Sequence, residues 1–153
     1  MITLVQRVTR ASVCTQDPPR QRNIELGLLV FVCAMADDTP DDVDWTANKL
    51  AGLRIFPDDD GRMNRSVLGV GGSMLVISQF TLAGDCRKGF RPSFVKAAEP
   101  ATGQVLFEAV AEALQETHGV PIETGVFGAS MQVELVNDGP VTIWIDSSTR
   151  GDR

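Results

Sequence analysis

The sequence predicts an α+β fold, in which a mixed or antiparallel sheet curls into a barrel-like form and carries two main helices. Strand-like segments outnumber helical ones, the helical segments do not alternate regularly with the strands, and 153 residues suffice for one domain with a buried core. We expect one domain over residues 1–147 and a frayed tail over residues 148–153.

The first third of the chain predicts two strands and a helix. Residues 2–8 alternate between two faces, and a polar connection over residues 16–23 leads to the apolar run 24–32, which is typical of a strand buried on both faces. The Thr-Pro pair at 39–40 indicates a helix start, because threonine caps the first turn and proline suits the first helical position. Apolar residues at helical spacing continue this helix, which should end before the Phe-Pro pair at 56–57.

The rest of the chain predicts a long loop, a second helix and the remaining strands. A strand that ends near residue 80 follows a glycine-rich turn at 69–72. Residues 83–96 are long and polar, so they form a candidate binding loop. The second helix follows the Glu-Pro pair at 99–100 and stops at the His-Gly pair at 118–119. Further strands are expected near Ile122 and over residues 131–136 and 141–145.

The composition is ordinary for a soluble globular protein, with 43% hydrophobic and 22% charged residues. The longest apolar stretch, residues 26–36, is too short to span a bilayer, and the first residues contain no basic leader followed by an apolar core. Three scattered cysteines without a Cys-x-x-Cys pair fit reduced thiols. We therefore expect a cytoplasmic protein that does not act on membranes.

Several classes of chemistry are excluded. The single histidine, His118, lies at a predicted helix end, where a cation stabilises the helix dipole, so a Ser-His-Asp or Cys-His site is not credible. One histidine and three separated cysteines give no metal-ligand spacing, and the chain has neither a phosphate-binding loop nor a dinucleotide fingerprint. We expect neither a metal nor another cofactor.

The net charge of −6 argues against a protein that coats nucleic acid generally, because lysine and arginine dominate phosphate binding. Four cations nevertheless fall within ten residues of the long loop, and a local basic patch on an acidic protein suits contact with one small RNA feature. From charge alone, a solvated basic loop explains them equally well. The four candidate RNA-contact residues are Arg87, Lys88, Arg91 and Lys96.

Two short segments carry most of the functional information, and each follows a strand-like run. The first motif is Ser-Gln-Phe-Thr-Leu at residues 78–82, and the second motif is Asn-Asp-Gly-Pro-Val-Thr at residues 137–142. Each places small polar groups and accessible backbone where a rigid sheet can position chemistry. Glycine lets the backbone approach a ligand closely, and the bond before proline tolerates the cis form. Taken alone, the second motif would be the tight turn of a hairpin.

Together and in this order, the two motifs resemble those of the D-aminoacyl-tRNA deacylases, the chiral-proofreading esterases of translation. The resemblance covers nearly the whole chain, and further matching segments lie at residues 5–8, 27–30, 49–56, 60–66, 89–94 and 124–129. It implies a twofold homodimer that acts at the 3′ acceptor end of aminoacyl-tRNA. The implied reaction is metal-independent hydrolysis of the D-aminoacyl ester to free D-amino acid and tRNA.

The resemblance makes the first motif the candidate catalytic segment. Because the aminoacyl ester is already activated, its hydrolysis needs no strong protein base. Positioning, backbone donors and one ordered water can supply the remaining catalysis. Backbone N–H groups around Ser78, Gln79 and Phe80 would stabilise the oxyanion, and Thr81 would orient or hydrogen-bond the reacting groups. Thr81 as a covalent nucleophile needs an activating base that the sequence does not offer, and a purely structural role as a β-branched strand residue stays open.

The second motif is the candidate chiral selector by the same resemblance. In that family the Gly-Pro pair is cis and inserts into the active site of the partner subunit; here Gly139 and Pro140 would do so, with Asn137, Val141 and Thr142 completing the motif. Their backbone carbonyls would capture the α-amino group, so that an L side chain collides with the main chain while a D side chain points outward. Glycine has no side chain to exclude, so some cleavage of glycyl-tRNA is expected.

Three further residues would support the site. Arg7 would brace the Gly-Pro segment, with an ordinary edge-strand arginine as the alternative, and Phe127 and Met131 would line the substrate pocket, with core packing as the alternative. The chain departs from the family pattern at positions that concern tRNA contact rather than the motifs. These are Cys86, Phe90, Ser130 and residues 16–23.

Two other functions stay open. A sister deacylase with a trans Gly-Pro pair and a wider pocket clears mischarged L-alanyl-tRNA, but the intact second motif favours the cis form. A catalytically silent RNA- or chromatin-binding module on the same fold is the other; a basic tail or extension would support it, and the sequence contains neither.

Overall fold

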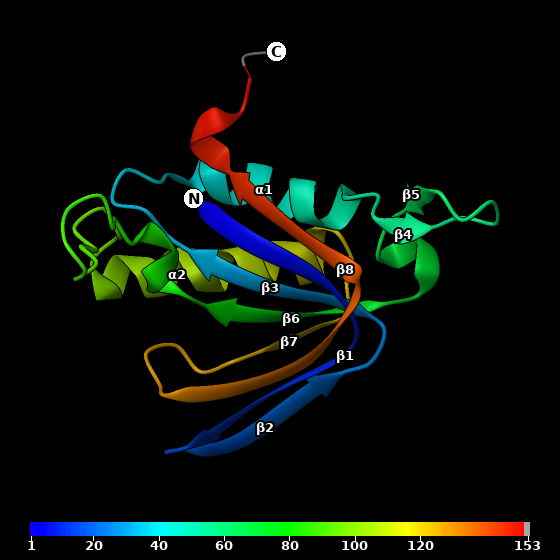
Figure 1. Cartoon of the computed structure of the whole chain (residues 1–153), viewed down its shortest axis with the longest axis horizontal. Helices are drawn as coiled ribbons and strands as arrows, with labels where there is room; N and C mark the ends of the chain where they lie inside the picture. Colours follow the sequence, from blue (N-terminus) through cyan, green and yellow to red (C-terminus); the bar gives the residue numbers. More distant parts are fainter. Residues whose placement is uncertain (152–153) are drawn as a thin grey trace.

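The computed structural model describes residues 1–151, and within them one sheet of six strands and one of two strands accompany two main helices (Figure 1). In chain order the elements are β1 (Ile2–Gln16), β2 (Pro19–Ile24), β3 (Gly27–Cys33), α1 (Pro40–Gly52), β4 (Phe56–Pro57), β5 (Met63–Arg65), η1 (Leu68–Val70), β6 (Ser73–Ser78), η2 (Phe80–Ala83), α2 (Pro100–Glu112), the π-turn η3 (Ala113–Thr117), β7 (Ile122–Thr124), β8 (Met131–Asp146) and η4 (Ser147–Thr149).

Strand β1 organises the large sheet because it pairs with three others. Its first half pairs antiparallel with β3, its second half pairs antiparallel with β2, and β8 follows both halves along the opposite edge. Strands β3, β6 and β7 continue the sheet in parallel. The sheet therefore curls where β1 changes neighbours, and Figure 1 shows β1, β2 and β8 bending away from the two helices. The predicted α+β class, mixed sheet, barrel-like curl and two helices are confirmed.

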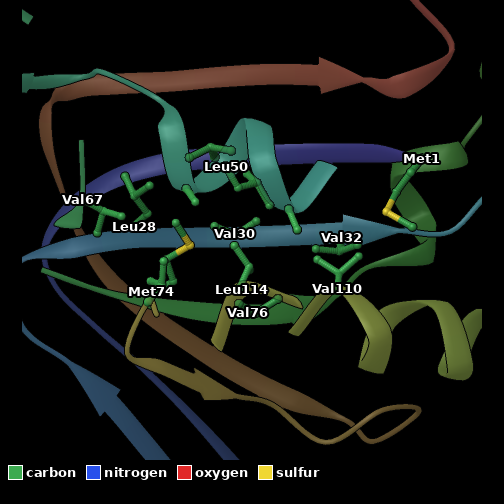
Figure 2. Packing of buried hydrophobic residues seen from close by; sticks show 14 of the residues in the cluster. Met1, Leu28, Val30, Val32, Leu50, Val67, Met74, Val76, Val110 and Leu114 are labelled. Atoms are coloured by element: carbon green, nitrogen blue, oxygen red, sulfur yellow. The ribbon is translucent and has the colours of Figure 1, made fainter. Parts of the chain in front are cut away.

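Apolar side chains cover both faces of the central strands. Toward the helices, Leu28 and Val30 of β3 lie with Leu50 of α1 and Leu114 of η3 in one cluster of buried side chains (Figure 2). On the opposite face, Leu29 packs in a second cluster inside the curl of the sheet. The predicted double burial of the apolar run is thus confirmed, with the strand itself bounded by Gly27–Cys33.

The prediction of a polar connection over residues 16–23 is wrong in part, because most of it is strand β2. Its residues pair with the second half of β1 in a regular antiparallel register from Ala11↔Ile24 to Gln16↔Pro19. This strand lies at the edge of the sheet, and most of its side chains are exposed. Backbone pairing therefore forms the strand without the apolar alternation that would have revealed it.

The prediction of two separate strands over 131–136 and 141–145 is also corrected. They form one continuous strand, β8, which pairs with β1 from Thr15↔Met131 to Ile2↔Asp146. The second motif is therefore not the turn of a hairpin. It bulges out of the ladder where the register shifts twice, between Gln6 and Val8 and between Val8 and Arg10.

Both helices begin where the sequence indicates. Asp42 accepts hydrogen bonds from the backbone N–H and hydroxyl of Thr39, at 3.0 and 2.8 Å, and so closes a capping box at the start of α1. Helix α2 begins at Pro100, continues through η3 and stops before Gly119, whose φ of +67° reverses the chain. No helix in residues 1–151 is long and apolar enough to cross a membrane.

The boundary between a domain ending at residue 147 and a frayed tail stays a prediction. Ser147 is buried and begins the short helix η4, and Arg150 pairs with Asp42 at 2.8 Å. Residues 152–153 of the expected tail lie outside the described residues.

Candidate active site

A cavity of about 620 Å³ opens at the carboxyl ends of the parallel strands β3 and β6. In open α/β sheets the carboxyl ends of parallel strands are the edge at which ligands bind most often, and these two parallel strands present the same kind of edge. Its walls are mostly apolar and come from the ends of β3 and β6, the start of β8 and the segments that flank α2. Of the residues predicted from the sequence, Ser78, Gln79, Phe80, Phe127 and Met131 line this cavity.

The first motif turns from strand to short helix at the cavity wall. The Gln79 N–H donates to the carbonyl of Val32 at 2.8 Å and is thereby engaged by the sheet. The next N–H groups, of Phe80 and Thr81, open the helix η2, where the first backbone donors have no partner inside the helix. The backbone N–H groups of this segment that are left to bind a ligand are therefore those of Phe80 and Thr81 rather than that of Gln79.

The Thr81 side chain is exposed and hydrogen-bonded within the first motif. The Gln79 amide nitrogen donates to Thr81 Oγ1, so the hydroxyl oxygen accepts and its proton is left to donate elsewhere. Among the hydrogen bonds of residues 1–151, none joins Thr81 to a carboxylate, an imidazole or an amine. This arrangement suits an orienting donor, because a nucleophile would need a base to take its proton.

Two cavity residues outside the predicted set shape this wall. Burial raises the pKa of the Cys33 thiol, and the thiol donates to the carbonyl of Phe80 at 3.5 Å. A protonated thiol is a weak nucleophile, so Cys33 supports the turn rather than attacking a substrate. Phe94 packs edge-to-face against Phe80, with 5.1 Å between ring centroids. An apolar residue in a loop and a lone cysteine carry no pattern by which the sequence could have found them.

The second motif is held away from its own strand by side-chain hydrogen bonds. The Asn137 amide donates to the carbonyls of Arg7 and Val141, both at 3.0 Å, and so spans the bulge. Gly139 has φ +123°, the peptide bond to Pro140 is cis, and both residues are exposed. Thr142 lies at the far side of the bulge, where its hydroxyl accepts from the Gln6 amide at 3.3 Å.

Arg7 lies against this bulge from inside the sheet, and its side chain is only 11% exposed. Its Nη1 donates to the carbonyl of Ile55 at 2.6 Å, and its Nε lies 2.9 Å from Asp138 Oδ2 in an ion pair that is not aligned as a hydrogen bond. A Cβ atom at Gly139 would come within 3.1 Å of Arg7 Nη2 and 2.7 Å of Val141 Cγ2. The sequence does not single out Asp138, although it lies within the second motif.

The two motifs of one chain lie at opposite ends of its large sheet. Arg7 is paired with Leu28 near the start of β3, whereas the cavity begins at Val32, four residues or roughly 13 Å farther along the strand. No residue of the second motif lines the cavity. Figure 1 shows β8 changing direction near its label, on the side of the molecule away from the arrowheads of β3 and β6.

The basic loop contains a second recess, of about 550 Å³. It is surrounded by Arg87, Lys88 and Arg91 together with Asp85 and Ser93. Lys96 is exposed outside this recess, and its carbonyl accepts from the Ala36 N–H at 3.0 Å. Over residues 1–151, no three His, Cys, Asp or Glu side chains gather closely enough to hold a metal ion.

Comparison with known proteins gives a consistent result. A family model described as D-Tyr-tRNA(Tyr) deacylase matches residues 4–146. A D-aminoacyl-tRNA deacylase of Thermotoga petrophila is 53% identical over 97% of this chain and 98% of its own length, and one of Dinoroseobacter shibae is 57% identical over 95% and 99%.

Two solved structures are similar in fold. One is described as the c-Myc DNA Unwinding Element Binding Protein, with TM-score 0.87, 35% identity and coverage of 95% of this chain and 98% of that one. The other is a probable eukaryotic D-amino acid tRNA deacylase, with TM-score 0.81, 15% identity and coverage of 94% and 97%. The second likeness concerns the fold alone.

Proposed function

Because the chain belongs to the D-Tyr-tRNA(Tyr) deacylase family, we propose that it hydrolyses the ester bond of D-aminoacyl-tRNA and releases the D-amino acid and tRNA. The observation that carries this proposal is the near full-length match to relatives of that name, with both motifs intact in this chain. The protein is thus an enzyme of translation quality control. Since aminoacyl-tRNA is made and used in the cytoplasm, that is where it would act.

The cavity at the first motif is the place for the aminoacyl ester. The ester carbonyl would lie at the start of η2, where the N–H groups of Phe80 and Thr81 can stabilise the oxyanion as it forms. Thr81 would donate a hydrogen bond to the substrate and so orient it, while Gln79 fixes the hydroxyl. Phe127 and Met131 would contact the aminoacyl group from the opposite wall. No metal or cofactor takes part in this scheme.

Chiral selection would need a second copy of the chain. Gly139 and Pro140 are exposed, they face no cavity of their own chain, and Arg7 holds their segment from behind. In a twofold dimer the selector of each subunit would enter the cavity of the other. Its carbonyls would bind the α-amino group of the ester, and an L side chain would then collide with backbone.

The basic loop would contact the RNA. Three of its four cations surround the recess beside the cavity, and Lys96 lies near its base, so the loop is placed to meet the 3′ acceptor end of a tRNA whose ester enters the cavity. An acidic chain with one local basic patch would bind this small feature without binding nucleic acid generally.

The test is deacylation of matched D-tyrosyl-, L-tyrosyl- and L-alanyl-tRNA in the presence of a chelator. Release from the D-ester, with L-tyrosyl-tRNA intact, is the expected result. Cleavage of L-alanyl-tRNA instead would assign the sister activity. Release from none of the three would favour a nucleic-acid-binding module, and the name of the first solved structure supplies a DNA probe for that case.

The cross-subunit selector is tested by subunit complementation. Gly139→Ala impairs the selector of one chain, and Ala129→Trp fills the cavity of another. Neither variant alone should be active. In dimers that form at random from equal amounts of both, an intact cavity meets an intact selector at about one quarter of all sites, so about one quarter of the wild-type rate should return. No recovery, with mixed dimers verified by tags, would place the selector within its own chain.

A further inference from the structure

The loop before α2 is built as a projection with a fixed base. Two backbone hydrogen bonds between Asp85 and Ser93, of 2.8 and 3.0 Å, close residues 85–93 into a hairpin-like loop. At its tip Gly89 has φ +65°, a conformation that glycine adopts without steric cost. The side chains at the tip are therefore displayed from a defined frame.

Phe90 is fully exposed at this tip, with a relative exposure of 108%. Burying a phenylalanine ring is worth about 1.5–3 kcal/mol, so an uncovered ring is a surface that a partner can use. The ring is flanked by cations along the chain and belongs to none of the three clusters of buried side chains. The fold itself gains nothing from an aromatic side chain here.

The cations beside Phe90 divide into two kinds. The Nε of Arg87 donates to both carboxylate oxygens of Asp85, at 2.9 and 3.0 Å, and the Nη2 of Arg87 donates to Oδ2. This contact lowers the pKa of Asp85 and raises that of Arg87. The charge of Arg87 is thus offset within the loop. Lys88 and Arg91 line the same recess, and no ion pair among the described residues engages them. Two free positive charges therefore flank the exposed ring.

The loop rises from the mouth of the cavity. Phe94 directly follows the loop, lines the cavity and packs against Phe80 of the first motif. Phe90 is only four residues, at most about 14 Å of chain, before Phe94. Figure 1 shows this loop projecting beyond the arrowheads of β3 and β6. A polynucleotide whose end enters the cavity must pass over the loop.

We propose that residues 85–93 bind the single-stranded nucleotides next to the aminoacylated one, with Phe90 stacked on a base and Lys88 and Arg91 paired with the flanking phosphates. This inference rests on the proposed function. An exposed aromatic ring between free cations is the pattern by which proteins hold single strands, since every base has a face to stack and every nucleotide a phosphate. Arg87 and Asp85 form the frame of this site rather than its contact surface.

The kinetic test compares Phe90→Ala, Phe90→Trp and the double variant Lys88→Ala/Arg91→Ala with the wild-type protein on D-aminoacyl-tRNA. Phe90→Ala should raise KM about 5- to 150-fold, the range for loss of one base stack, and leave kcat unchanged. Phe90→Trp should keep the wild-type KM. Val105→Ala and Lys49→Ala, on the solvent faces of α2 and α1, are the matched controls and should change neither constant. Equal melting temperatures verify folding.

The binding test uses a short single-stranded RNA that ends in CCA. The RNA should quench the fluorescence of the tryptophan introduced by Phe90→Trp. The double variant should lower the slope of log affinity against log salt by about 1.4, or about 0.7 for each phosphate that is no longer neutralised.

An unchanged KM and RNA affinity in Phe90→Ala would overturn the proposal even where the D-ester is still cleaved. Binding of phosphatidylserine vesicles that depends on Phe90, with unaltered RNA affinity, would overturn it in favour of a membrane surface. RNA binding that depends on Phe90 in a protein that cleaves no ester would uphold the loop site and refute hydrolysis.

Discussion

At the carboxyl ends of β3 and β6, the first motif lines a cavity whose walls come from its own chain. At the other end of the same sheet, the second motif presents exposed backbone and faces no cavity. The cavity end is held by the backbone pairing of β6 with β3 and by the apolar core beneath it. The selector end is held by a few polar contacts, from Arg7 and Asn137.

This difference indicates how strongly each end of the sheet should respond to a single substitution. A wall that many contacts support tolerates the loss of one side chain, whereas a bulge that two side chains position does not. The cavity end should therefore respond mildly to single substitutions, and the selector end strongly. Three predictions test this contrast, and a fourth concerns stability at neither end.

The largest effect is expected from Gly139→Ala. The added Cβ would meet Val141 and Arg7 at a φ of +123°, so the backbone of the bulge must shift. A displacement of about 1 Å at a binding site can cost 100-fold in rate, and we expect a loss of at least that order in D-aminoacyl-tRNA cleavage. Steady-state kinetics on D-tyrosyl-tRNA gives the measurement.

The matched control is Gly61→Ala. Gly61 also has positive φ, +78°, but a Cβ there would meet nothing within 4 Å. It should lower stability by about 1 kcal/mol through backbone strain alone and leave the rate intact. Equal rates for the two variants would mean that the position of the bulge does not matter to the reaction.

Arg7→Lys should have the next largest effect. Lysine lacks the planar fork that reaches both the Ile55 carbonyl and Asp138, so the bulge loses its support from behind. We expect a loss of about 1–3 kcal/mol in the free energy of unfolding and about tenfold in rate, measured by urea denaturation and deacylation. Arg22→Lys is the control, because its pair with Glu123 is about 40% exposed on both sides and should contribute no more than about 0.5 kcal/mol.

Thr81→Val tests the cavity end, where a smaller effect is expected. Removing one hydrogen bond costs about 0.5–1.5 kcal/mol, so the rate should fall about tenfold or less. Loss of a covalent nucleophile would cost about a millionfold instead. Thr81→Ser, which keeps the hydroxyl that Gln79 contacts, should retain most of the activity. Single-turnover rates separate these outcomes.

The sequence predicts the two ends unequally well. Helix α1 and strand β3 are recoverable because a Thr-Pro start and a continuous apolar run reflect local chemistry. The path of β8 is not recoverable, since Gly-Pro is a sound turn signal and only pairing with the distant residues of β1 keeps the strand continuous. Strand β2 is missed for a different reason, because its polar side chains face water on an edge and show no apolar alternation.

The candidate site shows the same division. The motifs themselves identify Gln79 and Thr81, but no pattern reveals that the Gln79 N–H is engaged by Val32. Arg7 is flagged as a brace, whereas its partners Asp138 and the Ile55 carbonyl come from segments about 50 to 130 residues away and need the fold to bring them together. What the sequence misses is in each case a contact between segments far apart in the chain.

Asp42→Asn should leave the rate unchanged and alter stability alone, because Asp42 lies at neither motif. Partial burial by itself would raise its pKa, but hydrogen bonds from Thr39 and Ser147 and the charge of Arg150 outweigh it and lower the pKa to about 2. Between that value and the ordinary one near 3.8, the unfolded chain binds more protons than the folded protein, so stability falls as the pH falls. The free energy of unfolding of the wild type should exceed that of Asp42→Asn by about 1–2 kcal/mol above pH 5, and this gap should shrink toward pH 2.

Urea denaturation at pH 7, 5 and 3 measures the gap. The exposed Asp59→Asn is the control and should change stability by no more than about 0.5 kcal/mol. A gap that stays constant down to pH 3 would mean that the carboxylate charge is not what ties the start of α1 to η4.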